Sequence, residues 1–411
     1  MSETILHLDK HVLLCFDVPA DEELIHEYNT LQSTFCGRVF NDDDIPWETI
    51  PQDAAIFFCG DFSKLPPKTA SHAGSRLKVI KELSSNHSES DTCQSISLGH
   101  VPINHHNAAI YFRNVLSPET DYFTTIHSEH QFQSLTESDK PSHSLRKGIY
   151  LSKVHTSGAG ETKFNLLRCS TNLSGPTLAF GSTDTEILDL ANTLATQHFS
   201  HPAEFNHVLA QVYSNTTVQS GPVTKERKAR IKAHADKTKD MPRNGMIAFC
   251  TIYSRDVYSH QRSQRDAFDY QYKNISVLTR LRFRLKDSVR GPETLEREFS
   301  VPLYPNSILM IPLSTNRLYT HETVPPSLDI SNIPTRLGYV IRCSDTEAVF
   351  RDGKTFIVRE GGEEVEMGRP SGDDVAGLRE RYLRENTTDE VVEYGDVNFS
   401  LNNGDYTRPM E

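Results

Sequence analysis

The feature of this sequence that most limits its fold is a series of short strand-like segments in the second half of the chain. Residues 246–253 form an apolar run, residues 307–313 have the same character, and residues 336–342 have strand propensity. Runs of this length, rich in β-branched and aromatic residues, are typical of strands buried on both faces. Further strands are predicted near residues 149–154, 163–167, 275–286, 296–303, 317–321 and 347–358.

Helices are predicted where apolar residues recur at intervals of three and four. This spacing marks residues 183–199 and 202–213, and a third helix is predicted over residues 373–384. Helices combined with many short strands indicate an α+β protein. We therefore predict a double-stranded β-helix (jelly-roll) core with flanking helices and an N-terminal extension.

The chain divides into three predicted regions. Residues 1–145 contain only scattered apolar runs and form an N-terminal region of unknown role, which we expect to pack on the core. Residues 146–360 hold the dense strand signals and form the predicted jelly-roll domain. Residues 361–411 form a C-terminal helix and an acidic tail, and such terminal segments are commonly mobile.

Three residues of this strand-rich part have the chemistry of metal ligands. His234 and Asp236 lie two positions apart, so on extended backbone their side chains point the same way. His321, far downstream, follows another strand-like segment and offers a third ligand. Two imidazoles and one carboxylate on one face of an iron ion leave other coordination positions open, as in non-haem Fe(II) oxygenases. His234, Asp236 and His321 are therefore the predicted metal ligands and catalytic centre.

Two arginines follow this set. Arg336 and Arg342 lie six residues apart in one strand-like segment, and an even spacing places both side chains on the same face of a strand. A planar guanidinium suits a carboxylate, because two parallel N–H···O bonds fit it.

The ordered combination of these residues resembles the Fe(II)/2-oxoglutarate-dependent dioxygenase superfamily, and within it the AlkB-like branch. The resemblance covers residues 200–345. In that family a tyrosine, an HxDK segment, a distal histidine and two arginines six apart recur in this order. Here they are Tyr213, His234-Ala235-Asp236-Lys237, His321, and Arg336 with Arg342.

The resemblance implies a role for each residue. His234, Asp236 and His321 would bind Fe(II), and Arg336 with Tyr213 would hold the far carboxylate of the co-substrate 2-oxoglutarate. Arg342 would lie near the keto-acid end of the co-substrate, or would meet the substrate. The implied reaction uses O2 to oxidise a C–H bond and releases succinate and CO2. Iron and 2-oxoglutarate would supply the O2 activation that this reaction requires.

Three positions depart from the AlkB-like pattern. An asparagine usually lies two residues before the tyrosine, where this chain has Gln211, and another follows the first arginine by two, where it has Gly338. Nucleic-acid demethylases carry an acidic residue two positions after the metal aspartate, which contacts the target base. Here that position is Thr238.

The substrate is predicted from charge. The net charge of −12 and Thr238 favour a small metabolite, such as an amino acid or a natural-product intermediate. The alternative is oxidative demethylation of alkylated DNA or RNA, because residues 225–232 form a basic run and Arg280, Arg282, Arg284 and Lys286 alternate with apolar residues. A non-enzymatic jelly-roll binding protein is the remaining hypothesis.

The sequence also predicts where the protein acts. Its seven cysteines are spread singly, which is typical of reduced thiols in an intracellular protein. The first residues lack a basic stretch followed by an apolar one, and no apolar run approaches the roughly 20 residues that span a bilayer. We therefore expect an intracellular protein, cytoplasmic or nuclear, with no membrane partner.

Overall fold

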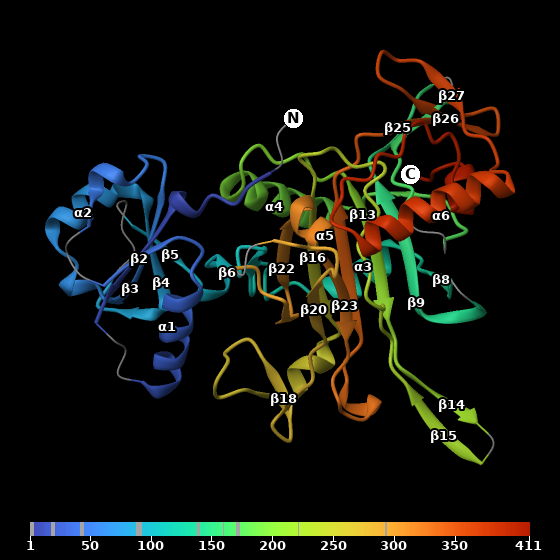
Figure 1. Ribbon diagram of the computed structural model, residues 1–411. Helices are drawn as coiled ribbons and strands as arrows, with labels where there is room; N and C mark the ends of the chain where they lie inside the picture. Colours follow the sequence, from blue (N-terminus) through green and yellow to red (C-terminus); the bar gives the residue numbers. More distant parts are fainter. Residues whose placement is uncertain are drawn as a thin grey trace.

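Figure 1 shows the computed structural model of the chain, an α+β protein with one parallel sheet and several antiparallel sheets. The N-terminal unit lies to one side, and the large antiparallel sheet with its helices forms the rest. The described residues are 4–17, 21–41, 45–87, 93–137, 140–158, 160–169, 173–220, 222–291 and 294–411.

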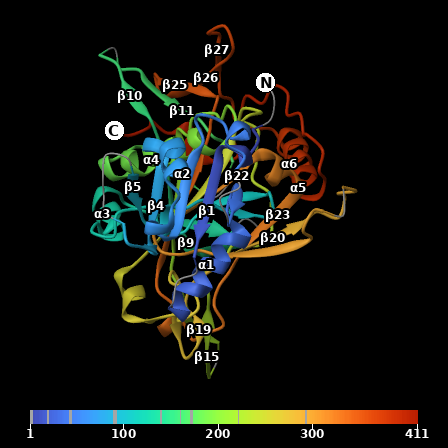
Figure 2. The ribbon, with the colours of Figure 1, turned by 90° about the vertical axis from the view of Figure 1, so that its left-hand side faces the viewer.

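The N-terminal unit is built on a five-stranded parallel sheet, which Figure 2 shows from its outer side. Its strand β1 (His11–Phe16) is buried along its whole length, as expected for a parallel strand covered on both faces. The strand order is β2-β1-β3-β4-β5. The other elements are α1 (Glu22–Thr34), β2 (Arg38–Phe40), β3 (Ala55–Asp61), α2 (Pro67–Ala73), β4 (Leu77–Ser85) and β5 (Cys93–Ile96).

The largest sheet has nine strands and supplies one wall of the candidate site. Its path is β12-β9-β13-β24-β16-β22-β7-β6, with β8 paired to β9. The central strands pair antiparallel. The strands are β6 (Ile103–His105), β7 (Ala109–Phe112), β8 (Gln133–Glu137), β9 (Lys140–Ser152), β12 (Leu178–Ala179), β13 (His207–Tyr213), β16 (Met246–Tyr253), β22 (Ser307–Pro312) and β24 (Arg336–Arg342).

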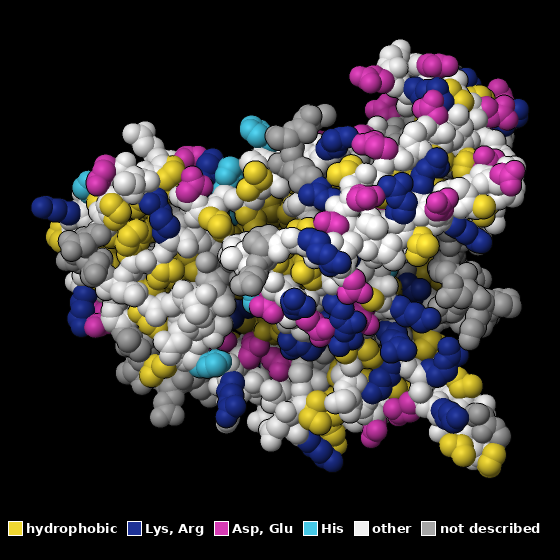
Figure 3. All heavy atoms as spheres, in the orientation of Figure 1, with side chains coloured by type: hydrophobic (Ala, Val, Ile, Leu, Met, Phe, Trp, Pro, Cys, Tyr) yellow, Lys and Arg dark blue, Asp and Glu magenta, His cyan; other side chains and the backbone are white. Residues whose placement is uncertain are grey.

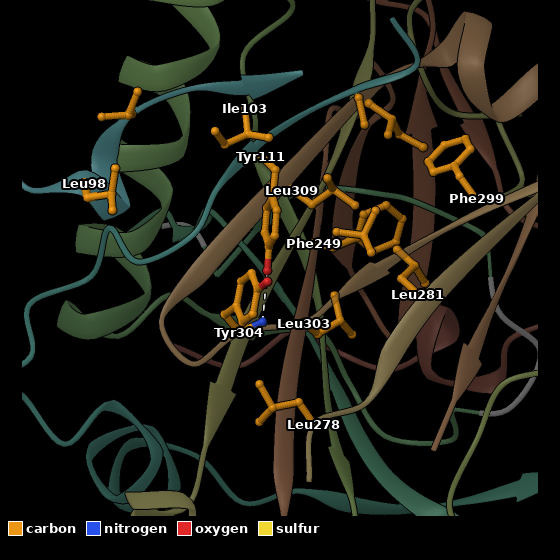
Figure 4. Packing of buried hydrophobic residues seen from close by; sticks show 14 of the residues in the cluster. Leu98, Ile103, Tyr111, Phe249, Leu278, Leu281, Phe299, Leu303, Tyr304 and Leu309 are labelled. Carbon is orange, nitrogen blue, oxygen red and sulfur yellow. Dashed lines mark hydrogen bonds between the residues drawn. The ribbon is translucent and has the colours of Figure 1, made fainter. Parts of the chain in front are cut away.

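A three-stranded antiparallel sheet faces the large sheet. It consists of β21 (Glu298–Pro302), β20 (Arg280–Leu285) and β23 (Tyr319–Val324). Figure 4 shows the apolar core between the two sheets, where Phe249 and Leu309 of the large sheet belong to the same buried cluster as Leu281 and Phe299. On the opposite face of the large sheet, a second buried cluster includes residues of α3 (Tyr122–Glu129) and α4 (Ser182–His198).

The remaining elements are small sheets, short helices and the C-terminal helix. One sheet comprises β10 (Val154–Thr156), β11 (Thr162–Asn165), β25 (Glu347–Arg351), β26 (Lys354–Val358) and β27 (Glu364–Glu366), and another β17 (Gln261–Arg262), β18 (Tyr270–Tyr272) and β19 (Ile275–Ser276). A separate two-stranded hairpin consists of β14 (Thr216–Ser220) and β15 (Val223–Arg227). The last two α-helices are α5 (Leu313–Leu318) and α6 (Gly372–Thr387). Short 3₁₀ turns cover Leu8–Lys10, Trp47–Thr49, Phe62–Lys64, Gly74–Arg76, Leu98–His100, Arg255–Ser259, Ile330–Asn332 and Asn403–Tyr406.

Several predicted elements are confirmed. The strand predicted over residues 246–253 is β16, and the helices predicted over 183–199 and 373–384 are α4 and α6. No helix in the described ranges is both long enough and apolar enough to cross a membrane.

The helix predicted over residues 202–213 is wrong. Residues His207–Tyr213 form strand β13, and every residue of it is buried. A strand covered on both faces is apolar at nearly every position, so its sequence also satisfies a helical spacing. The strand predicted over 317–321 is partly wrong as well, because α5 continues to Leu318 before β23 begins.

The N-terminal unit packs on the core through buried polar contacts. Glu27 of α1 forms an ion pair of 2.8 Å with Arg113, and both side chains are buried. Its other carboxylate oxygen accepts the backbone N–H of Ala267 at 2.9 Å. His11 stacks on His198 of α4, with ring centroids 4.4 Å apart. The strands β6 and β7 also precede residue 145, although they belong to the large sheet.

The acidic tail packs against the protein, which contradicts the expectation of a mobile end. Asn402 is fully buried, and Asp405 is nearly so. Asp405 accepts hydrogen bonds from the Ser400 hydroxyl at 2.5 Å and the Asn402 amide at 2.8 Å. The polar residues of the tail therefore satisfy one another inside the fold.

Asp405 is expected to make the protein less stable as the pH rises from 5 to 7.5. Burial raises the pKa of Asp405 to about 6, so the folded state holds a proton that the unfolded state has lost. Stability falls as pH rises through this range, by about 1.4 kcal/mol for this group. Urea denaturation of wild type and Asp405→Asn should show a difference in unfolding free energy that changes by this amount between pH 5 and pH 7.5. A pH-independent difference would contradict the assignment.

Candidate metal centre

The antiparallel pairing of two segments brings His234 and His321 together. The two residues form an isolated bridge, in which each backbone N–H donates to the other's carbonyl at 3.1 and 2.8 Å. Directly opposed residues of an antiparallel pair carry their side chains on the same side. The imidazole centroids lie 4.5 Å apart.

Asp236 completes the group of three. One ligand atom from each of His234, Asp236 and His321 lies within 4.8 Å of the other two. The Nε2 atom of His234 is 3.5 Å from Oδ1 of Asp236. Asp236 and His321 are buried, whereas the His234 side chain is 31% exposed, so the group opens to solvent on the His234 side. The predicted metal ligands therefore converge, and two imidazoles with a carboxylate suit Fe(II).

Asn316, at the end of α5, fixes the backbone of the metal aspartate. Its Oδ1 accepts the N–H of Asp236 at 2.8 Å, and its Nδ2 donates to the Asp236 carbonyl at 3.0 Å. Asn316 is itself buried. Nothing in the sequence distinguishes this asparagine, because the contact joins segments that are far apart along the chain.

Arg342 forms an ion pair with the metal aspartate. Its Nε and Nη2 donate to Oδ2 of Asp236 at 2.9 and 2.8 Å, and both side chains are buried. Burial alone would raise the pKa of Asp236, but the charge of Arg342, with contributions from His234 and His321, holds it well below its usual value. The carboxylate is thus ionised at neutral pH. The structure places Arg342 beside the candidate metal ligands, at the end of β24 opposite to Arg336.

The imidazole of His321 is held in its neutral form. Burial, together with the neighbouring charge of His234, lowers the pKa of His321 to about 3. The ring packs edge-on against Phe249 of the large sheet, with centroids 5.2 Å apart. A neutral imidazole has a free lone pair, which is the form that binds a metal.

Arg336 lies at the other end of the same face of β24 and has unused donors. Its guanidinium carbon is 3.7 Å from the centroid of the Tyr213 ring, and the residue is only 5% exposed. Its Nε and Nη2 find no hydrogen-bond partner among the residues that the structure describes. Buried polar groups are normally paired, so this guanidinium indicates a site for an anionic ligand.

The two departures in the AlkB-like pattern at positions 211 and 338 meet at this arginine. Gln211 on β13 is opposite Gly338 on β24, and its Oε1 accepts the Tyr213 hydroxyl at 3.0 Å. A Cβ atom on Gly338 would lie 2.7 Å from Nη1 of Arg336. The missing side chain at position 338 therefore leaves the space that the Arg336 guanidinium occupies.

A second group of metal-ligating residues has a structural explanation. Glu129, His130 and Asp184 also bring ligand atoms within 4.8 Å of one another. However, His130 Nε2 is hydrogen-bonded to Asp184 at 2.5 Å, Tyr339 donates to the other Asp184 oxygen at 2.6 Å, and Glu129 accepts from Thr183. These contacts join α3 to the N-terminus of α4.

Comparisons with known proteins give structural similarities but no sequence match. No protein-family model matches the chain, and no curated protein matches it. Among solved structures, the structure of OsALKBH1 matches with a TM-score of 0.34 and 11% sequence identity. The match covers 57% of this chain and 96% of that one. The function proposed below rests on the geometry of the site.

Proposed function

We propose that the chain is an Fe(II)- and 2-oxoglutarate-dependent oxygenase of the AlkB-like kind, on a double-stranded β-helix. The two facing antiparallel sheets support this core. The large sheet contributes Arg336 and Arg342, and the small sheet contributes His321. His234 and Asp236 reach the same place from the segment that pairs with β23.

The observation that carries the proposal is the unpaired guanidinium of Arg336 on the strand face that also bears Arg342. His234, Asp236 and His321 would hold Fe(II) at one end of this face. Arg336, stacked on Tyr213, would bind the far carboxylate of 2-oxoglutarate through its two unpartnered nitrogens. When bound, iron and 2-oxoglutarate supply the chemistry by which O2 oxidises a C–H bond, with release of succinate and CO2.

The hairpin β14–β15 favours a nucleic-acid substrate over the small metabolite. It projects from the molecule and precedes in the chain the segment His234–Lys237, here called the metal segment. Figure 3 shows basic side chains on the hairpin. Lys225 and Arg227 are exposed and form no ion pair with any described residue. By contrast, Arg282 and Arg284 on β20 pair with Glu322 and Glu298 at 2.5 and 2.9 Å. The unpaired cations of the hairpin can therefore contact phosphates.

Oxidative demethylation of alkylated DNA or RNA is thus the proposed reaction, and oxidation of a small metabolite is the second candidate. An oxidised N-methyl group would leave as formaldehyde, with the nitrogen regaining a proton. The test is formation of succinate from 2-oxoglutarate and of formaldehyde from N-methylated single-stranded oligonucleotides, with His234→Ala as the inactive control. If metabolites support succinate formation and none of the oligonucleotides does, the second candidate is established instead.

Binding of unmodified oligonucleotides tests the hairpin separately. The double variant Lys225→Ala/Arg227→Ala should bind more weakly than wild type. The slope of log Kd against log salt should fall by about 1.4, because each lost phosphate contact on a single strand removes about 0.7. Arg284→Ala, which removes an ion-paired arginine, is the matched control and should leave the slope unchanged. Equal slopes for all three proteins would remove the hairpin from the interface.

Gly338→Ala is expected to weaken 2-oxoglutarate binding without unfolding the protein. The added methyl group would displace the end of the flexible Arg336 side chain, so the backbone need not move. Loss of one charged hydrogen bond corresponds to about a tenfold weaker affinity. Calorimetric titration of 2-oxoglutarate in the presence of Mn(II) measures this change. Gly377→Ala, where a Cβ atom meets nothing within 4 Å, is the control and should bind normally.

A further inference from the structure

The C-terminal helix contacts the backbone on both sides of the metal aspartate. The N–H of Ala235 donates to Oδ1 of Asn386 at 2.8 Å, and the N–H of Thr238 donates to Oε1 of Glu385 at 3.1 Å. The Thr238 hydroxyl also donates to this Glu385 oxygen. Asn386 and Glu385 both lie in the last turn of α6, so one turn of helix holds the segment before and after Asp236.

Two lysines, the partly buried Lys237 and the buried Lys286, strengthen this attachment at the C-terminal end of α6. Lys237 donates to Oδ1 of Asn386 at 3.0 Å and to the carbonyl of Tyr382 at 3.3 Å. Lys286 donates to the carbonyls of Glu385 and Thr388 at 2.6 and 3.0 Å, and it also reaches α5, which lies beside α6 in Figure 1. Cations are favoured at this end of a helix, because the peptide dipoles leave it partly negative. Lys286 is therefore a buried anchor, contrary to its expected place on an exposed basic face.

The apolar packing of the C-terminal segment is separate from that of the two sheets. Leu378, Val392, Tyr394 and Val397 form their own buried cluster, and the partly buried residues packed on it also come from this segment. The clusters on the two faces of the large sheet contain none of these residues. The contacts of Glu385 and Asn386 with the metal segment are polar, so they can be removed without opening the main core.

We propose that Glu385 and Asn386 are positioning residues for the metal centre. They hold the N–H groups of Ala235 and Thr238, and thereby set the positions from which His234 and Asp236 present their ligand atoms. Asn316 bonds the backbone of Asp236, and His321 bonds the backbone of His234, so hydrogen bonds hold the metal segment from several sides. The position that contacts the target base in the demethylases is occupied here by Thr238, whose hydroxyl is committed to Glu385. This inference rests on the proposed function, because it concerns the same metal segment.

Anaerobic titration with Co(II), followed by its visible absorption, tests the inference in the full-length protein. Asn386→Ala and Glu385→Ala remove the acceptors and should each weaken Co(II) binding on the order of tenfold, with a changed band shape. Asn386→Asp and Glu385→Gln keep an oxygen acceptor and should restore both. Arg384 lies in the same turn of α6 as Glu385 and forms an exposed ion pair with Glu390 beyond the helix, so Arg384→Ala is the matched control.

Amide hydrogen exchange of the metal-free protein provides a second measurement. The N–H groups of Ala235 and Thr238 should exchange faster in Asn386→Ala and Glu385→Ala, respectively, while amides of β16 and β24 remain protected. Wild-type Co(II) affinity and spectrum in both alanine variants would overturn the proposal, as would unchanged exchange. If the wild-type protein binds no Co(II), the proposed metal function fails, and the exchange rates still decide whether α6 holds the segment.

Discussion

Replacing Arg342 by methionine is expected to lower the free energy of unfolding by about 3–5 kcal/mol at neutral pH. The reason is the buried carboxylate of Asp236, which receives two hydrogen bonds from Arg342 and would be left without its counter-charge. Removing one partner of a buried ion pair is costly because the remaining charge has lost its hydration. Urea denaturation of the metal-free protein measures the effect.

Two further variants test the cause of this destabilisation. Arg342→Met combined with Asp236→Asn should recover most of the stability, because no buried charge remains unpaired, but it should not bind Co(II), because the ligand carboxylate is gone. Arg282→Met removes a partly exposed partner of Glu322 and should cost about 1 kcal/mol or less. A double variant as unstable as the single one would show that Arg342 stabilises the fold by packing alone.

Arg336→Met is expected to have the opposite effect on stability and the larger effect on co-substrate binding. The buried guanidinium has two nitrogens without partners, so its removal should leave the metal-free protein equally stable or more stable. Affinity for 2-oxoglutarate should fall on the order of 100-fold or more, because the carboxylate loses its charged partner. Calorimetric titration with Mn(II) present measures the affinity, and urea denaturation measures the stability.

A conservative variant separates charge from geometry at this position. Arg336→Lys keeps the charge but cannot form two parallel bonds to a carboxylate, so it should bind 2-oxoglutarate with intermediate affinity. In thermal unfolding with Mn(II) present throughout, added 2-oxoglutarate should stabilise wild type further and give no further stabilisation of Arg336→Met. If Arg336→Met instead loses as much stability as Arg342→Met, the guanidinium has a structural role and the co-substrate assignment is wrong.

The predictable part of the fold is the part with long or strongly periodic segments. The run over residues 246–253 is apolar throughout and is β16, and α4 follows the helical spacing of its apolar residues. The same rule fails at His207–Tyr213, because burial on both faces removes the alternation that distinguishes a strand from a helix. The parallel sheet of the N-terminal unit was not predicted, since the pairing of its strands joins segments distant in sequence.

For the candidate site, the sequence predicts the chemical types better than the contacts. The convergence of His234, Asp236 and His321 follows from their spacing and the strands around them. The ion pair between Arg342 and Asp236 and the free donors of Arg336 depend on where each guanidinium lies, which spacing does not determine. Asn316, Glu385 and Asn386 act through backbone groups of a distant segment, and no local pattern marks such residues.

The strands β6 and β7 have a practical consequence for dissecting the protein. They precede residue 145, yet β7 pairs with β22 at one side of the large sheet and β6 pairs with β7. A truncation that begins at residue 146 would strip both and leave β22 as a bare edge, whose unpaired N–H and C=O groups can recruit another chain. Such a fragment is expected to aggregate even though it retains all three metal ligands. A truncation before Leu98 keeps the two strands and is the better choice for expressing the part that carries the candidate metal centre.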